Sequence, residues 1–173
     1  AAGCGHTLKE YGQILQDDPG YAQKAQDFAA KVRDAQEFLA TVGLTTPLNP
    51  LTSEAFPLVY QDACHLLHGQ KIAAQPRDLL RQIPNMQLRE PAEHNLCCGS
   101  AGVFNLLQPK IAAELGERKA RNLLNTGAKA IASANPGCSL QIQNQLQQQG
   151  QTIPLWHPME LLDFAIRGVP LPL

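Results

Sequence analysis

The sequence predicts an α/β fold, with a small parallel, Rossmann-like sheet in which strands and helices alternate after one extra N-terminal helix. Two observations predict it. From residue 58 onward, short apolar runs alternate with longer segments of helical periodicity. A chain of 173 residues is also long enough to bury one core without disulfides. The expected order is therefore β-α-β-α-β-α-β-α, with right-handed crossovers.

The region before the sheet is expected to be helical and then irregular. A short helix is expected over residues 8–15. Apolar side chains recur at helical spacing over residues 21–42, which predicts one amphipathic helix. Gly43 fits the position just past the end of that helix. Residues 45–57 hold three prolines and are expected to form a connecting loop.

The alternating region is divided by its apolar runs and its prolines. Strands are expected at the short apolar runs, and helices at the longer segments between them. Pro84 must end the first of these helices. Strands are expected at residues 58–60, 86–89, 128–134 and 153–156, and helices at residues 76–82, 109–125, 139–149 and 158–166.

Composition excludes several classes of function. Fourteen basic and fifteen acidic side chains give a net charge of −1, so the chain has no single-sign field to attract nucleic acid or an anionic membrane. The sequence shows neither a signal-peptide pattern nor an apolar run of membrane-spanning length. We therefore expect a cytoplasmic protein, with a peripheral place at the inner membrane as an alternative.

Five cysteines, an odd number that includes one adjacent pair, favour ligation over disulfides. On the expected topology, Cys64 follows the first strand, Cys97 and Cys98 follow the second, and Cys138 follows the third. The carboxyl ends of parallel strands share one edge of the sheet, so we expect these four thiols to meet there. All-sulfur ligation suits either an iron–sulfur cluster or zinc.

Three strings around these cysteines resemble the cysteine-rich CCG domain family. They are Asp62-Ala63-Cys64-His65-Leu66, Cys97-Cys98-Gly99-Ser100-Ala101-Gly102 and Asn135-Pro136-Gly137-Cys138. The family includes glycolate oxidase iron–sulfur subunits, lactate-utilisation proteins and one of the subunits of heterodisulfide reductase. The sequence around the three strings is most similar to the glycolate oxidase member.

The resemblance implies an iron–sulfur electron-transfer subunit that works beside flavin-containing glycolate oxidase subunits. It implies a 4Fe-4S cluster on Cys64, Cys97, Cys98 and Cys138, with FAD confined to the partner subunit. It also implies an N-terminal ferredoxin-like domain that is missing here, so this piece alone should not oxidise glycolate. Zinc in a structural or scaffold domain remains the alternative cofactor and function.

The family usually carries two copies of the domain, and the start of this chain resembles the end of one. Ala1-Ala2-Gly3-Cys4-Gly5 matches residues 135–139, because each string has small residues and Gly-Cys before a helix. Cys4 is therefore a further candidate cofactor ligand from a preceding copy. We expect residues 1–50 to contain the end of that copy and a connecting helix, and residues 51–173 to form the complete domain.

Other polar residues have ordinary interpretations. Gln141 stands where heterodisulfide reductase-like members have a further cysteine, which weakens a thiol-reductase function. No catalytic residue is expected. His65 is expected to donate to the site from behind Cys64, and His157 to cap the last helix. His94 is expected to be a surface or turn residue, and the charged stretch 114–121 is expected to be a solvated face.

Overall fold

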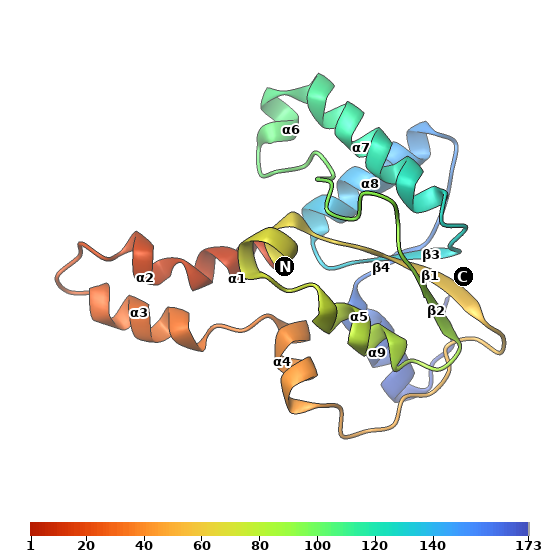
Figure 1. Ribbon diagram of the computed structural model, residues 1–173, viewed down its shortest axis with the longest axis horizontal. Helices are drawn as coiled ribbons and strands as arrows, with labels where there is room; N and C mark the ends of the chain where they lie inside the picture. Colours follow the sequence, from red (N-terminus) through yellow and green to blue (C-terminus); the bar gives the residue numbers. More distant parts are fainter. Residues whose placement is uncertain (173) are drawn as a thin grey trace.

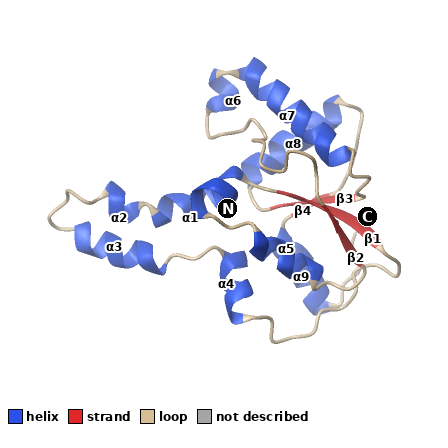
Figure 2. Cartoon of the chain, viewed as in Figure 1, coloured by secondary structure: helices blue, strands red, loops and turns tan. Residues whose placement is uncertain are grey.

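The computed structural model describes residues 1–172 and has a four-stranded, all-parallel sheet with helices on both faces (Figure 1 and Figure 2). The predicted α/β class is confirmed. In spatial order the strands are β2 (Met86–Arg89), β1 (Phe56–Gln61), β3 (Ala130–Ser133) and β4 (Leu155–Trp156). The predicted strands correspond to these four, although β3 and β4 are shorter than the apolar runs suggested.

Alternating side chains of the strands form two separate cores. Leu58 and Tyr60 of β1 point to the face covered by α5 (Ala74–Arg81) and α9 (Pro158–Arg167). Val59, between them, points to the face covered by α7 (Pro109–Leu124) and α8 (Pro136–Gln148). Figure 1 shows these two helical layers on opposite sides of the sheet. All the strand side chains of β1 except Pro57 are buried, as expected of a central parallel strand.

The helices cover opposite faces because the chain moves across the sheet in both directions. From β1 it steps outward to β2 through α5, then returns past β1 to β3 through α7 and continues to β4 through α8. Right-handed crossovers in opposite directions place their helices on opposite faces. The direction reverses between β1 and β3, which defines the topological switch point of the sheet.

The region before the sheet differs from the prediction of one helix over residues 21–42. It contains α3 (Ala22–Lys31) and α4 (Ala35–Val42), separated by extended backbone at Val32 and Asp34. Asp34 ends the continuity because its carboxylate accepts from the backbone of the next turn and forms a capping box with Glu37. The Asp-x-x-Glu spacing was the signal that periodicity alone overlooked. Gly43 ends α4, as expected.

The first helix begins earlier in the chain than predicted. The helix expected over residues 8–15 is two helices, α1 (Ala2–Lys9) and α2 (Tyr11–Ile14), with the break at Glu10. Lys9 pairs with Glu37 at 2.7 Å and so ties α1 to α4. Helices α1 to α3 form the arm that extends away from the sheet in Figure 1.

Smaller differences concern the connections. The loop expected to run to Pro57 ends earlier, because β1 begins at Phe56, and α8 begins at Pro136 rather than Ser139. Two short helices were not predicted, a π-helix η1 (His65–Gln70) directly after Cys64 and α6 (Phe104–Leu107) after the cysteine pair. No helix within residues 1–172 is long and apolar enough to cross a membrane. The division into residues 1–50 and 51–173 remains a prediction.

Candidate metal centre

The candidate site lies where β1 and β3 end, at the switch point of the sheet. Gln61 and Ser133 are the last residues of these strands, and both side chains are buried. The Ser133 hydroxyl donates to Gln61 Oε1 at 2.8 Å, which satisfies a polar pair inside the edge of the sheet. The two segments that leave this edge carry Cys64 and Cys138.

The four predicted thiols come together at this edge. Cys138 is the third residue of α8 and is buried, as is Cys98, whereas Cys64 and Cys97 are partly exposed. Hydrogen bonding by Cys64 and then Cys98 lowers the pKa of the Cys97 thiol, and hydrogen bonding by Cys98 lowers the pKa of Cys138. The neighbouring thiols, Cys97 for Cys64 and Cys138 and Cys97 for Cys98, raise the pKa values of these two cysteines. The four thiols are therefore near enough to shift one another's pKa values.

Polar groups of the surrounding loops also point at the sulfurs. The backbone N–H of Gly99 donates to Cys97 Sγ at 3.4 Å, and the Asn135 side-chain amide donates to Cys138 Sγ at 3.4 Å. His65 Nδ1 lies 3.7 Å from Cys64 Sγ, in agreement with the expected supporting position of this histidine. N–H donors such as those of Gly99 and Asn135 stabilise thiolates, whether free or bound to metal.

Glycines allow the loops around the sulfurs to approach one another closely. Gly99 has φ of +87°, and a Cβ added there would lie 2.3 Å from the carbonyl oxygen of Ala112. A Cβ at Gly116 would lie 3.1 Å from the Cys98 carbonyl oxygen, so α7 packs directly against the cysteine pair. Gly137 allows α8 to approach the loop that follows the cysteine pair, since an added Cβ would lie 3.1 Å from Ser100 Oγ.

A buried charged network stands behind Cys64 and was not predicted from the sequence. Asp62 is almost completely buried and receives two hydrogen bonds from Arg77, at 2.8 and 2.6 Å. Arg77 also binds Glu90 through two contacts, and its guanidinium lies over the Tyr60 ring. Only the tertiary structure pairs these residues, because Asp62 and Arg77 belong to different elements.

Of the surface predictions near this network, that for His94 is confirmed, because His94 is an exposed turn residue, and that for Lys119 is wrong. His94 contacts Asp62 through Nδ1 at 3.3 Å, and its carbonyl oxygen accepts from Lys119 Nζ at 2.6 Å. Lys119 is 0% exposed, although it lies within the charged stretch 114–121 that was expected to face solvent. The rest of the stretch follows helical geometry, since Gly116 and Ala120 are buried with Lys119 and the acidic and arginine side chains are more exposed.

Cys4 lies at the same edge but in a different setting. It is exposed and lines a groove of about 580 Å³ together with His65, Ser100, Asn135 and Gly137. Cys4 is the third residue of α1, just as Cys138 is the third residue of α8, and the Gly3 N–H lies 3.5 Å from Asn135 Oδ1. The matching helix positions strengthen the likeness between the two Gly-Cys strings. The role of Cys4 as a ligand remains a prediction.

The donor set fits the predicted cofactor in chemistry. Four sulfur ligands at the end of a sheet, with backbone and amide donors beside them, suit an iron–sulfur cluster or zinc. Within residues 1–172, no three His, Cys, Asp or Glu side chains surround a common point closely enough for one metal ion. The ligand assignment to Cys64, Cys97, Cys98 and Cys138 therefore remains a prediction that the gathering of the thiols supports.

Two other predicted positions have clear local roles. Gln141, which stands where related proteins have a thiol, donates through Nε2 to the Ala112 carbonyl at 3.2 Å and so connects α8 to α7. His157 caps α9 as expected, because its Nδ1 accepts from the Met159 N–H at 3.1 Å. Burial lowers the pKa of His157 and keeps the imidazole neutral for this role.

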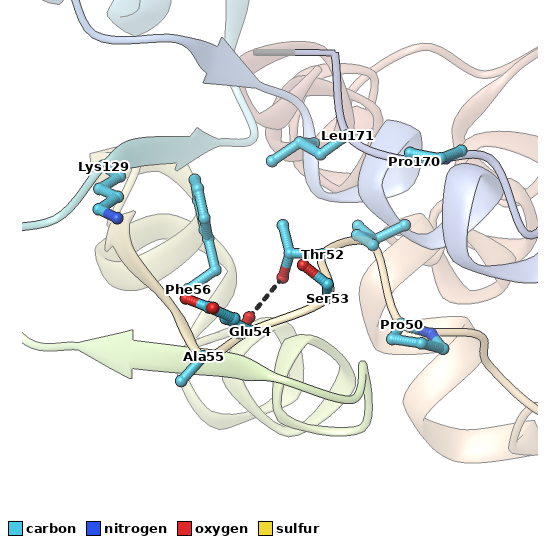
Figure 3. Close-up of a pocket in the computed structure, with 10 residues that line it drawn as sticks. Pro50, Thr52, Ser53, Glu54, Ala55, Phe56, Lys129, Pro170 and Leu171 are labelled. Carbon is cyan, nitrogen blue, oxygen red and sulfur yellow. Dashed lines mark hydrogen bonds between the residues drawn. The ribbon is translucent and has the colours of Figure 1, made fainter.

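A second groove lies at the opposite, amino-terminal edge of the sheet (Figure 3). It has a volume of about 560 Å³ and lies between the start of β1, the residue before β3 and the C-terminal segment at Leu171. Its wall includes Phe56 and Lys129, and Thr52 donates to the Glu54 carbonyl at 2.8 Å. The groove contains no cysteine and lacks the convergence of strand ends found at the thiol edge.

Comparison with known proteins agrees with the geometry. Residues 58–143, which span β1 to α8, match the model of the cysteine-rich domain family CCG. The chain is 34% identical over 151 residues to the probable glycolate oxidase iron–sulfur subunit of Bacillus subtilis, covering 87% of this chain and 34% of that protein. It is 33% identical over 165 residues to a subunit of the fumarate reductase (CoM/CoB) of Methanothermobacter marburgensis, covering 95% of this chain and 31% of that protein.

A third relative is shorter. Lactate utilization protein A of Halalkalibacterium halodurans is 27% identical over 164 residues, which cover 95% of this chain and 66% of that protein. The chain thus spans about a third of the length of the first two relatives and about two thirds of the third.

Proposed function

Because this chain belongs to the CCG family of cysteine-rich domains through residues 58–143, we propose that it is an iron–sulfur electron-transfer domain of a flavin-dependent 2-hydroxy-acid oxidoreductase. Its similarity to a glycolate oxidase iron–sulfur subunit supports glycolate as the substrate of the whole complex. The observation that carries the proposal is the gathering of four thiols from three strand ends at one edge of the sheet.

In this proposal Cys64, Cys97, Cys98 and Cys138 hold a 4Fe-4S cluster, which when bound supplies one-electron transfer. Burial of Cys98 and Cys138 keeps water away from the inner side of the site. The Gly99 N–H and the Asn135 amide stabilise the sulfurs they contact, and they therefore influence the reduction potential. Cys4 would contribute to a neighbouring ligand set built mainly by a preceding copy of the domain.

The proposed partners are the flavin-containing subunits, where FAD takes up the electrons of the 2-hydroxy acid, and a ferredoxin-like domain of the same subunit. The four thiols lie at an edge that also borders the groove of about 580 Å³, so this side of the molecule faces the donor and acceptor. This chain would hold the cluster and provide a surface for the flavin-containing subunits, and we expect no glycolate oxidation by it alone.

The test is to purify the full-length protein with its flavin subunits without air and to measure iron and acid-labile sulfide. The proposal expects both in the wild type and their loss from this site in Cys98→Ser. Ala63→Ser is the matched control, because it also adds a buried hydroxyl beside the site but removes no thiol. Zinc without sulfide, or wild-type electron transfer from glycolate to a dye in Cys98→Ser, would show the proposal to be wrong.

The similarity to a fumarate reductase subunit named for CoM/CoB raises a second candidate, a thiol or disulfide reductase. The position of Gln141 weighs against it, since its amide is already engaged by the Ala112 carbonyl and supplies no further thiol. Assaying the same anaerobic preparation for disulfide reduction separates the candidates, because the electron-transfer proposal expects no such activity.

A further inference from the structure

Lys119 is a buried cation on α7, the helix that packs against the loop of Cys97, Cys98 and Gly99, here called the ligand loop. It lies on the face of α7 that begins with Ala112 and Gly116, and both of those residues touch the loop of Cys98 and Gly99. Its side chain is 0% exposed. Lysine is almost never fully buried unless an opposite charge compensates it, because removing an ammonium from water is costly.

The ordinary partners of a buried lysine do not account for this one. Its hydrogen bond goes to the neutral His94 carbonyl at 2.6 Å. Among the side chains of residues 1–172, no carboxylate forms an ion pair with it, and Asp62 already receives two hydrogen bonds from Arg77. Burial lowers the Lys119 pKa, while Asp62 and the thiols of Cys98, Cys138 and Cys97 raise it. Three of the four opposing charges are thus predicted ligands.

We infer that Lys119 is a positioning residue whose buried positive charge compensates the thiolate set when metal is bound and raises the reduction potential of the site. This inference rests on the proposed function. Four thiolates leave an iron–sulfur site with net negative charge, and taking up one electron from the partner flavin adds one more. A nearby cation that keeps its proton stabilises the reduced form more than the oxidised form. The same electron then leaves to the acceptor.

The hydrogen bond to His94 gives Lys119 a second effect, on the entrance to the ligand loop. His94 lies three residues before Cys97. A purely structural role would therefore consist of holding this loop in place. The two roles differ in what they predict, because loop anchoring acts with or without metal whereas charge compensation acts only when the thiolates are gathered around one.

The experiment compares Lys119→Met, which removes the charge but keeps length, with Lys119→Arg, which keeps the charge. Lys110→Met is the matched control, since Lys110 is exposed on the same helix. The full-length proteins are stripped of metal, then reloaded with ferrous iron and sulfide or with zinc. Melting temperatures are measured before and after loading, and reduction potentials are measured by electron paramagnetic resonance during a redox titration.

We expect metal loading to raise the melting temperature of Lys119→Met less than that of the wild type, Lys119→Arg and Lys110→Met. In the iron–sulfur form, the midpoint of Lys119→Met should shift to more negative potential by at least a tenfold change in the oxidised-to-reduced ratio, which is about 59 mV for one electron. Lys119→Arg should recover most of that shift, and Lys110→Met should show none.

The other outcomes show whether the proposed function, the inference on Lys119 or both are wrong. If Lys119→Met lowers the melting temperature equally with and without metal and leaves the potential unchanged, the residue is only structural and the inference is wrong while the cluster stands. If the wild type takes up zinc but no cluster, the proposed function is wrong. Charge compensation by Lys119 then stands if zinc raises the melting temperature of Lys119→Met less than that of the wild type, and is wrong if the two rises are equal. If the wild type binds neither, both are wrong.

Discussion

Replacing Gly99 with alanine places a Cβ where the loop after the cysteine pair meets α7. Alanine would have to adopt φ near +87°, a left-handed conformation that costs an L-residue about 1–2 kcal/mol. Its Cβ would also lie 2.3 Å from the Ala112 carbonyl oxygen, so the loop and α7 must separate, which costs roughly 1–3 kcal/mol more as overpacking. We therefore expect Gly99→Ala to reduce the free energy of unfolding by roughly 2–5 kcal/mol.

Gly102→Ala is the matched control, because Gly102 lies in the same loop with φ of +63° but an added Cβ meets nothing within 4 Å. It should lose only the conformational part, about 1–2 kcal/mol. Urea denaturation followed by circular dichroism measures both variants against the wild type. Equal losses in Gly99→Ala and Gly102→Ala would refute the close approach of α7 to Gly99, since of these two glycines Gly99 is the one that faces the Ala112 carbonyl.

Three further predictions concern residues outside the loop that carries Cys97 and Cys98. Arg77→Met leaves the Asp62 carboxylate buried without its main partner and should cost about 3–5 kcal/mol by urea denaturation; the double variant with Asp62→Asn should recover much of the loss, and no recovery would contradict the pairing. Asp34→Ala removes the capping box of α4 and should cost about 1 kcal/mol, whereas Asp27→Ala, on the exposed face of α3, should cost less. Burial lowers the His157 pKa in the folded state, so the stability from its neutral form is complete above the unfolded pKa of about 6.5 and is lost as pH falls. Unfolding measured between about pH 7.5 and 5.5 should therefore show a smaller loss in His157→Asn than in the wild type, and equal losses would contradict the cap.

The order of elements after residue 58 could be derived from the sequence because strand and helix periods differ and prolines mark several boundaries. All four strands and the four helices between and after them are present in the structure. The helix expected over residues 21–42 was wrong because its apolar periodicity continues across residues 32–34, while the capping interactions of Asp34 decide the backbone there. A local polar contact thus outweighed a repeating apolar pattern.

The cysteines could be predicted to meet because topology alone brings the carboxyl ends of parallel strands to one edge. Their relation to Lys119 could not be predicted, since a helix drawn from sequence shows Lys119 only as one more charge in residues 114–121. Its burial depends on how closely α7 approaches the loop, which Gly99 and Gly116 allow through contacts with residues distant in the chain.

By itself the sequence determined the alternation of strands and helices, the family resemblance and the choice of candidate sulfur ligands, because these depend on residue type and on order along the chain. The tertiary structure decided which charges are buried against them. Asp62, Arg77 and Lys119 belong to different elements, and their cost or benefit depends on burial and on distances of a few ångströms that no pattern along the chain specifies.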